Sequence, residues 1–404
     1  MMLLIGDCIE QMRTLEADSV DAIVTDPPYG LEFMGKEWDG FGTPLGFQTW
    51  SEQWAREALR VLKPGGHLLA FGGTRMYHRL AAGIEDAGFE IRDTLMWLYG
   101  SGFPKSLDVS KAIDKAAGAE REVVGKATGG GFSDKTIGTI GHSKGAPDIT
   151  APSTEAAKKW QGWGTALKPA VEPIVLARKP LIGTVAENVL THGTGALNID
   201  ASRIGIAEGD EPKAGKRTAT FGTLETTSGG DGSGGWNASS GRWPANILLD
   251  EEAAALLDEQ SGVSKSAPAK GHNRLGNLIG DGRSAKSAGL YGDGAWISGS
   301  NHNDSGGASR FFYVAKASRS ERNAGLERNI HPTVKPVALM KYLIRLVVPK
   351  GGVVLDPFLG SGTTAVAAIE EGVEWIGCER EPEYVEIIKA RVAAAQPGMG
   401  LTLD

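Results

Sequence analysis

Four consecutive residues near the N-terminus, Asp26-Pro27-Pro28-Tyr29, could bind and activate an aromatic amine. They follow a mainly apolar run, residues 20–24, that predicts a buried strand, so they lie where a strand runs out into a loop. Ligands of open α/β sheets bind just beyond the carboxyl ends of strands. Two prolines make this loop rigid and supply no N–H groups, which leaves a carboxylate, a backbone carbonyl and an aromatic ring side by side. The trio suits a flat heterocycle with an exocyclic amine; a simple turn capped by Asp26 is the alternative.

A second candidate site is a glycine-rich turn near the C-terminus. Residues 353–355 predict a strand, residues 356–364 (Asp-Pro-Phe-Leu-Gly-Ser-Gly-Thr-Thr) a turn, and residues 365–370 a helix. Glycines allow a ligand to approach the backbone closely, and a helix N-terminus offers free N–H groups. The turn therefore predicts a binding site for a polar ligand.

The spacing within this region indicates an adenosine-containing cofactor. Gly360, Gly362 and Ala365 match the dinucleotide fingerprint G-x-G-x-x-G/A. Glu379 ends the next predicted strand, 17 residues after Gly362, where an acidic side chain can accept hydrogen bonds from ribose hydroxyls. A P-loop is excluded, because no lysine follows Gly362.

Together these motifs resemble those of the β class of DNA amino-methyltransferases, which use S-adenosylmethionine to methylate the N6 of adenine or the N4 of cytosine. Asp26-Pro27-Pro28-Tyr29 resembles their catalytic motif, and Phe358-Leu359-Gly360-Ser361-Gly362 their cofactor motif F-x-G-x-G. Residues 331–336 (His-Pro-Thr-Val-Lys-Pro) resemble the element that precedes the cofactor strand, and Gly6-Asp7-Cys8 a further acidic motif. The resemblance covers about residues 1–100 and 330–390, with the catalytic motif first, and the middle of the chain is similar to enzymes of phages and prophages.

The resemblance implies roles for individual residues. It assigns Glu379 to the ribose, Asp7 to the neighbourhood of the adenosine, and Phe358, Gly360 and Gly362 to the methionine and sulfonium end. Thr333 and Lys335 would bind the cofactor carboxylate, although Thr333 could instead cap a helix with Pro336 in its first turn. The full set of expected cofactor-binding residues is Asp7, Asp26, Thr333, Lys335, Asp356, Phe358, Gly360, Gly362, Thr363 and Glu379.

The expected chemistry is direct methyl transfer to a base that has been flipped out of the duplex. An exocyclic aryl amine is a poor nucleophile, because its lone pair is delocalised into the ring. If Asp26 and the Pro27 carbonyl each accept one N–H, the nitrogen is drawn toward tetrahedral geometry and can attack the sulfonium methyl in line. Tyr29 would stack on the flipped base, and positioning and electrostatics would supply most of the rate.

Several functions compete at this point. Adenine N6 is the leading target, because Asp at the first motif position favours adenine, and cytosine N4 is the alternative. A nicotinamide-dependent oxidoreductase, a catalytically silent DNA-binding module, and RNA or protein substrates stay open. Methylation of cytosine C5 is excluded, because that family uses a Pro-Cys pair and neither cysteine of this chain follows a proline.

Composition and charge set further bounds on the chain of 404 residues. Its net charge of −7 lacks the basic footprint usual for DNA-binding proteins, yet residues 96–180 hold 12 Lys and Arg against 8 Asp and Glu, and residues 260–330 hold 10 against 5. This pattern indicates either a DNA-contacting insertion or ordinary solvated charges. DNA is the expected partner; a homodimer and a restriction-enzyme partner stay open.

Other classes of site are not expected. Two cysteines give neither a disulfide framework nor metal-ligand spacing, so no metal is expected and a reducing cytoplasm is the default; both are expected to be buried at strand ends. No apolar run approaches 18 residues, so we expect no contact with a membrane. The 57 glycines, about twice the usual share, gather in residues 125–145, 222–241 and 271–307, which predicts long loops or a target-recognition region that orders on DNA.

The elements that would position these sites alternate between strand and helix, which predicts a doubly wound, largely parallel α/β sheet. The Rossmann-like, S-adenosylmethionine-dependent methyltransferase sheet of seven strands, one of them reversed, would fit. Three parts are expected: a catalytic half at 1–100, an insertion at 101–330 in which 170–180 returns to the sheet, and a cofactor half at 331–404. Expected strands are 3–5, 22–25, 67–71, 90–99, 170–177, 353–355 and 374–378; expected helices are 8–15, 50–61, 77–87, 336–348, 365–370 and 382–394, with a turn at 63–66.

Overall fold

Ten strands of the described chain form one sheet with a single reversed strand. The computed structural model describes residues 1–31, 39–102, 106–126, 148–205, 241–265, 305–316, 319–327, 329–331, 333–396 and 402–403. The strand order is β11-β8-β4-β7-β3-β2-β12-β13-β1-β14, and β7 alone is antiparallel to its neighbours. The strands are β1 (Met2–Ile5), β2 (Val20–Thr25), β3 (Leu62–Phe71), β4 (Glu90–Leu98), β7 (Val171–Arg178), β8 (Ile247–Asp250), β11 (Tyr313–Ala315), β12 (Val353–Asp356), β13 (Glu374–Glu379) and β14 (Thr402–Leu403). The expected mostly parallel sheet with one reversed strand is confirmed.

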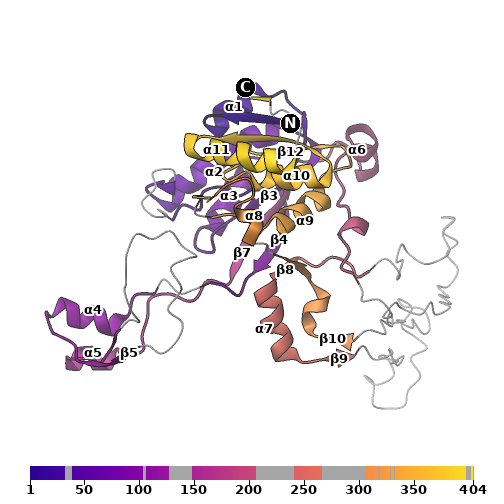
Figure 1. The fold of residues 1–404 in the computed structure, drawn as a ribbon. Helices are drawn as coiled ribbons and strands as arrows, with labels where there is room; N and C mark the ends of the chain where they lie inside the picture. The colour runs from indigo at the N-terminus through magenta and orange to yellow at the C-terminus, as the bar shows by residue number, and fades with distance from the viewer. Residues whose placement is uncertain are drawn as a thin grey trace, which may run out of the picture.

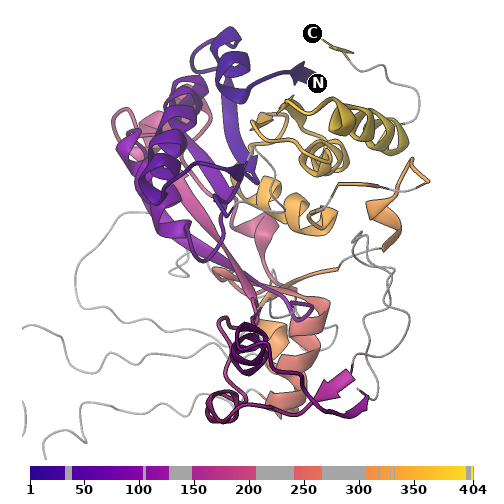
Figure 2. The same cartoon turned by 90° about the vertical axis from the view of Figure 1, so that its left-hand side faces the viewer.

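Helices cover both faces of this sheet. One face carries α1 (Cys8–Thr14), α2 (Pro44–Val61) and α3 (Tyr77–Asp86); the other carries α9 (Val337–Val347), α10 (Thr363–Glu371) and α11 (Pro382–Ala395). The two sets lie on opposite sides of the strands in Figures 1 and 2, the first in indigo and purple, the second in orange and yellow. Each set packs its apolar side chains on one face of the sheet, so two hydrophobic cores form a three-layer domain.

The central strand β2 is buried along its whole length. Such a strand must satisfy any polar side chain that it contains. Asp21 accepts hydrogen bonds from Lys63 Nζ at 2.6 Å and from the backbone N–H of Val353 at 2.8 Å. This carboxylate therefore joins β2 to the start of the neighbouring strand β12.

The structure differs from the expected elements in three places. Helix α2 begins at Pro44 and not at residue 50, because Thr43 caps it and a proline suits the first turn. The predicted turn at 63–66 is wrong: these residues belong to β3, whose register against β2 shifts between the Val20–Leu62 and Ala22–His67 pairs. Strands β8, β11 and β14 extend the sheet from the expected seven strands to ten, although no strand was expected in these segments.

The described chain has further elements outside this sheet. They are α6 (Val185–His192), the 3-10 helices η3 (Asp200–Ser202) and η5 (Ala308–Phe311), α7 (Glu251–Ser261), β9 (Ser264–Lys265), β10 (Ser305–Gly306) and α8 (Arg319–Arg322). The amide of Asn188 on α6 donates to the carbonyls of Pro64 and Thr194, which ties this helix to the β3 segment. No helix of the described ranges is long and apolar enough to cross a membrane. Most of the glycine-rich stretches at residues 125–145, 222–241 and 271–307 lie outside the described residues.

The part of the chain that connects β4 to β7 forms a small unit, which stands apart from the sheet (Figures 1 and 2). This unit, which we call the α4–α5 module, contains α4 (Val109–Ala116), β5 (Val123–Lys126), β6 (Asp148–Thr150) and α5 (Glu155–Lys159). Strands β5 and β6 pair antiparallel, and the chain enters and leaves the module near the pairing of Asp108 with Gly164. The Trp160 and Trp163 rings meet edge to face at 5.1 Å, and both side chains are exposed.

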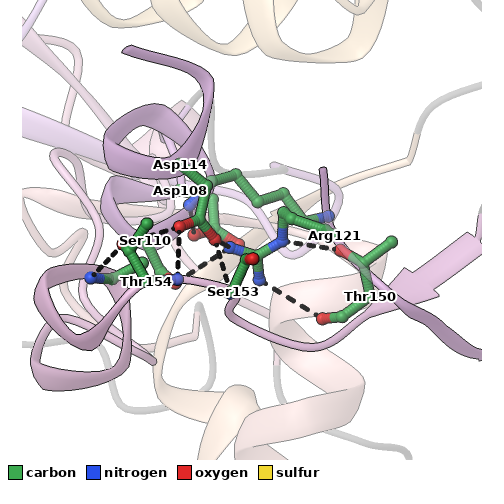
Figure 3. A network of polar contacts seen from close by, with 9 residues as sticks. Asp108, Ser110, Asp114, Arg121, Thr150, Ser153 and Thr154 are labelled. Carbon is green, nitrogen blue, oxygen red and sulfur yellow. Dashed lines mark hydrogen bonds and ion pairs between the residues drawn. The ribbon is translucent and has the colours of Figure 1, made fainter. Parts of the chain in front are cut away.

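A buried carboxylate holds the α4–α5 module together (Figure 3). Asp114 on α4 is fully buried and accepts hydrogen bonds from the Ser153 N–H and from the Thr154 N–H and hydroxyl, at 2.9, 2.9 and 2.7 Å. It also pairs with Arg121, whose guanidinium reaches Thr150. Burial alone would raise the pKa of Asp114, but these hydrogen bonds and the arginine together lower it to about 2.

We therefore expect Asp114→Ala to open the α4–α5 module while the main sheet stays folded. Loss of the carboxylate leaves several buried donors without an acceptor. Hydrogen–deuterium exchange should become at least about tenfold faster in residues 108–126 and 148–163 and stay unchanged in β2 and β12. Because the pKa of Asp114 is depressed, the module is stabilised above the ordinary value of 3.8 and loses this stabilisation as the pH falls toward about 2. Asp108→Asn, which keeps the cap of α4, is the matched control; equal protection in the alanine variant would contradict the role of Asp114.

Candidate active site

The two predicted loops lie side by side at the carboxyl edge of the sheet. Strands β2 and β12 are neighbours, so Asp26 after β2 and the turn after Asp356 leave the same edge. The Thr25 hydroxyl donates to Asp356 Oδ1 at 2.6 Å. Asp356 also accepts from the Phe358 N–H at 3.0 Å and the Thr364 hydroxyl at 2.5 Å. One buried carboxylate thus joins the strand before Asp26, the glycine-rich turn and the first turn of α10.

Asp356 is a buried side chain whose partners are all protein groups. Burial raises the pKa of Asp356 to about 6, and hydrogen bonds from Thr25 and Thr364 oppose that shift. Both of its oxygens are occupied by protein donors. Its expected contact with a cofactor stays a prediction, while the contacts seen here support the two loops.

The loop that follows β2 places Asp26 and Tyr29 against Lys335. The Tyr29 hydroxyl donates to Asp26 Oδ1 at 2.8 Å, and Lys335 Nζ donates to Asp26 Oδ2 at 2.6 Å. Pro27 is buried and Pro28 partly exposed between them. The structure therefore brings Lys335 to Asp26 and Tyr29, although Lys335 follows Asp26 by 309 positions in the sequence.

A second carboxylate, Glu172 on β7, completes this cluster. Its Oε2 lies 3.2 Å from the Tyr29 hydroxyl and 3.3 Å from Lys335 Nζ. Burial and the two carboxylates raise the pKa of Tyr29 well above its ordinary value. Burial would lower the pKa of Lys335, but Asp26 and Glu172 together raise it above its ordinary value. The site thus holds a neutral phenol, an ammonium and two carboxylates.

The far end of the same loop is held by Asp39. This buried side chain accepts from the N–H groups of Gly30 and Leu31 at 2.6 and 3.0 Å. Gly30 has φ +67°, and a Cβ there would lie 2.9 Å from the Phe47 ring. The loop is consequently fixed at both ends, before Asp26 and after Tyr29.

The glycine-rich turn needs its glycines for two physical reasons. Gly360 and Gly362 have φ of +54° and +78°, which side chains other than glycine rarely adopt. A Cβ on Gly360 would come within 3.0 Å of His331 Nε2, and one on Gly362 within 3.3 Å of the Ile388 Cα. Burial lowers the pKa of His331 to about 4, so a neutral ring lies against this turn.

A buried arginine holds the glycine-rich turn through hydrogen bonds. Arg391 on α11 donates to the Ser361 carbonyl at 2.7 Å, to the Ser361 hydroxyl at 3.1 Å and to the Thr363 hydroxyl at 3.0 Å. Burial lowers the pKa of Arg391 to about 10, which leaves the guanidinium charged near neutral pH. The side chain of Thr363 is itself buried, so the contact seen for it is with the protein and its expected role toward a cofactor stays a prediction.

Two acidic residues lie together beside this turn. Glu379 ends β13 and accepts from the Gly360 N–H at 2.7 Å and the Glu381 N–H at 2.8 Å. Asp7 caps α1 through the Ile9 N–H at 2.9 Å, and the neighbouring Gly6 N–H donates to the Glu379 carbonyl. Burial raises the pKa of Glu379 to about 7, against hydrogen bonds that lower it. Asp7 and Glu379 therefore lie near each other, at the ends of two neighbouring strands.

The other expected residues occupy separate positions. Phe358 packs on α2, with its ring centroid 5.5 Å from Trp50 and 5.4 Å from Trp54. Thr333 is exposed and does not cap α9, which begins at Val337 with Pro336 before it, so the capping alternative is wrong. Cys8 and Cys378 are buried, as expected.

Three residues of this site had no assigned role in the sequence. Glu172 is the one acidic residue of an otherwise apolar predicted strand, and that isolation was a usable signal. Asp39 gave none, because the backbone N–H groups that it binds, eight and nine positions earlier, leave no pattern in the sequence. Arg391 gave none, because its partners Ser361 and Thr363 lie about 30 positions away on another element. The described residues contain no group of three or more metal-ligating side chains.

Comparison with known proteins places most of the chain in one family. A family model described as DNA methylase, of the N6/N4 type, matches residues 20–390. The type II methyltransferase M.HindIII of Haemophilus influenzae is 23% identical over 412 residues, which cover 93% of this chain and 89% of that protein. M.HinfI of the same species is 29% identical over 109 residues, 24% of this chain and 30% of its own. The solved PvuII DNA methyltransferase (cytosine-N4-specific) aligns with 98% of this chain and 87% of its own at 16% identity and a TM-score of 0.46.

The position of Asp356 gives a stability prediction. Asp356→Ala should lower the free energy of unfolding by about 3 kcal/mol, because two buried hydroxyls and one N–H lose their acceptor. Asp356→Asn keeps the shape and part of the acceptor capacity, so it should cost about 1 kcal/mol. Urea denaturation, monitored by tryptophan fluorescence, measures the free energy of unfolding of both variants. An alanine variant as stable as the parent would show that Asp356 does not hold the two loops.

Proposed function

Because the chain belongs to the N6/N4-type DNA methylases, we propose that it transfers a methyl group from S-adenosylmethionine to the exocyclic N6 of adenine in DNA. Transfer to the N4 of cytosine is the alternative. The observation that carries the proposal is the hydrogen bond between Thr25 and Asp356, which fixes the Asp26 loop and the glycine-rich turn at adjacent strand ends. An acceptor for an amine and a cradle for a nucleoside thus share one edge of the sheet.

The residues of the glycine-rich turn fit S-adenosylmethionine. Gly360 and Gly362 let the turn keep its shape while His331 and α11 pack on it, because a Cβ at either position would come within 3.0 Å of His331 or 3.3 Å of Ile388 on α11. Glu379 would accept from the ribose hydroxyls, with Asp7 beside the adenosine. Phe358 would border the methionine end, and Thr333 and Lys335 would face its carboxylate. When bound, the cofactor supplies an electrophilic methyl group on a sulfonium.

The residues of the Asp26 loop would activate the amine. Asp26 would accept one N–H of the target amine and the Pro27 carbonyl the other, which concentrates the lone pair on nitrogen. Two prolines fix both acceptors before the base arrives, so little reorganisation is needed. Asp26 or water would take the proton that the amine loses.

Access to a base in duplex DNA requires that the base be flipped out of the stack. Tyr29 offers a ring on which it would stack. A Cβ on Gly73 would lie 3.0 Å from that ring, so the end of β3 packs closely against Tyr29. This contact would hold the ring in place for the base.

The choice of adenine over cytosine rests on Asp26. Cytosine N4 enzymes of the family often carry Ser at this position, and Asp favours adenine. A nicotinamide-dependent oxidoreductase and a silent DNA-binding module explain less, because neither gives a role to the cluster of Asp26, Tyr29, Lys335 and Glu172.

Mass spectrometry of nucleosides tests this function directly. The purified protein is incubated with unmethylated plasmid DNA and S-adenosylmethionine, and we expect N6-methyladenine. Detection of N4-methylcytosine would show that cytosine, and not adenine, is the target base. If the protein binds the cofactor but produces no methylated nucleoside, the proposed substrate is wrong.

Asp26→Ala should reduce methyl transfer by about 10³-fold or more while cofactor binding stays largely intact. The variant removes the first acceptor of the amine, but Lys335 keeps its contact with Glu172. Asp26→Asn retains one acceptor oxygen and should lose less. Nucleoside mass spectrometry gives the rate and isothermal titration calorimetry the cofactor affinity; an alanine variant with parental turnover would refute the assigned chemistry.

The pKa of Glu379 predicts a pH dependence of cofactor binding. With the pKa raised to about 7, the carboxyl is largely protonated at pH 6 and ionised at pH 8. Ribose hydroxyls donate better to the ionised form, so affinity should rise about tenfold from pH 6 to pH 8. Calorimetry at a series of pH values measures it. The Glu379→Gln variant should bind the cofactor more weakly, and its affinity should no longer depend on pH in this range. If its affinity keeps the same pH dependence, another group is responsible for it.

A further inference from the structure

Glu172 contacts both of the groups that bind Asp26. Its Oε2 lies 3.3 Å from Lys335 Nζ and 3.2 Å from the Tyr29 hydroxyl. The same two groups lie 2.6 and 2.8 Å from the two oxygens of Asp26. An ammonium and a hydroxyl therefore bridge two carboxylates on different elements, one after β2 and one on β7.

This arrangement leaves Asp26 engaged on both oxygens. Tyr29 donates to Oδ1 and Lys335 to Oδ2. A charged donor at 2.6 Å makes a strong hydrogen bond, which weakens the carboxylate as an acceptor for a neutral amine. Asp26 would therefore be a stronger acceptor for the amine once these two partners loosen.

We propose that Glu172 is a positioning residue that takes Lys335 and the Tyr29 hydroxyl over from Asp26 when the target amine arrives. The inference rests on the proposed function, because it needs an amine to compete for Asp26. Both groups already lie within reach of Glu172, so neither has to find a new partner. The transfer frees an Asp26 oxygen without leaving the lysine unpaired.

The backbone of Glu172 is suited to this role because it is fixed. Strand β7 lies between β3 and β4, Glu172 pairs with Trp97, and the carbonyl of the next residue, Pro173, accepts the Gly72 N–H at 2.9 Å. A carboxylate on a rigid strand can hold the lysine while Asp26 exchanges it for the target amine.

The charges of the cluster require such a second acceptor. The Lys335 side chain is 10% exposed, and an ammonium so far from water is costly without a carboxylate beside it. Since Asp26 and Glu172 keep Lys335 cationic, it needs an acidic partner at every stage. Glu172, 21% exposed, is within ion-pair distance at 3.3 Å.

The test is Glu172→Gln in the full-length protein, assayed by single-turnover methyl transfer to unmethylated DNA at saturating S-adenosylmethionine. We expect the rate to fall by about 10- to 100-fold, because Lys335 stays on Asp26, while cofactor affinity is unchanged. Glu90→Gln is the matched control. Glu90 also stands on the β4–β7 pair and binds Arg178, but at the opposite end of these strands, so its rate should equal that of the parent.

A double-mutant cycle separates positioning from simple structural support. In a Lys335→Met background, Glu172→Gln should cost clearly less rate than in the parent, because only its effect through the Tyr29 hydroxyl remains. An equal loss in both backgrounds would overturn the proposal, as would a Glu172→Gln variant that is as fast as the parent. A parent protein that transfers no methyl group at all would instead contradict the proposed function.

Discussion

The hydrogen bonds of Asp356 are the contact on which the rest of the site depends. A buried carboxylate cannot remain without partners, so Asp356 gathers donors from β2, from the glycine-rich turn and from α10. Those donors belong to segments more than 300 residues apart in the chain. Their convergence sets the spacing between the Asp26 loop and the glycine-rich turn. The same carboxylate therefore stabilises the fold and aligns the two halves of the proposed reaction.

The acidic residues near this contact differ in the kind of hydrogen-bond partner that they have. Glu379 lies at the end of a strand with backbone N–H groups as partners, whereas Asp26 and Glu172 share the Lys335 ammonium. A carboxylate whose partners are N–H groups keeps lone pairs for a neutral ligand. A carboxylate paired with an ammonium cannot be released unless the cation has another partner. The two acidic centres are consequently suited to different tasks, binding at Glu379 and activation at Asp26.

The sequence predicted those parts of the site that depend on neighbours in the chain. Asp26 to Tyr29 and Gly360 to Gly362 are contiguous motifs at strand ends, and the reversed strand at 170–177 was visible as an apolar run. Arg391 and the partnership of Glu172 with Lys335 were not, because each depends on a contact between distant segments. Asp39 was not, because it binds backbone N–H groups, which any residue type supplies. Strands β8 and β11 are short, and they become strands only by pairing with the edge that β4 leaves open. The turn predicted at 63–66 failed because β3 absorbs a register shift without ending.

The reversal of β7 explains how a large insertion can be tolerated next to the site. Because β7 runs antiparallel to β4, the chain leaves β4 and re-enters β7 at the same edge of the sheet. The Tyr99 N–H donates to the Ala170 carbonyl and closes the insertion at its base. The α4–α5 module beyond this closure is held by its own buried carboxylate, Asp114, so its stability does not draw on the main core. Glu172 follows two residues after Ala170, so the Asp26 cluster lies next to the base of the insertion.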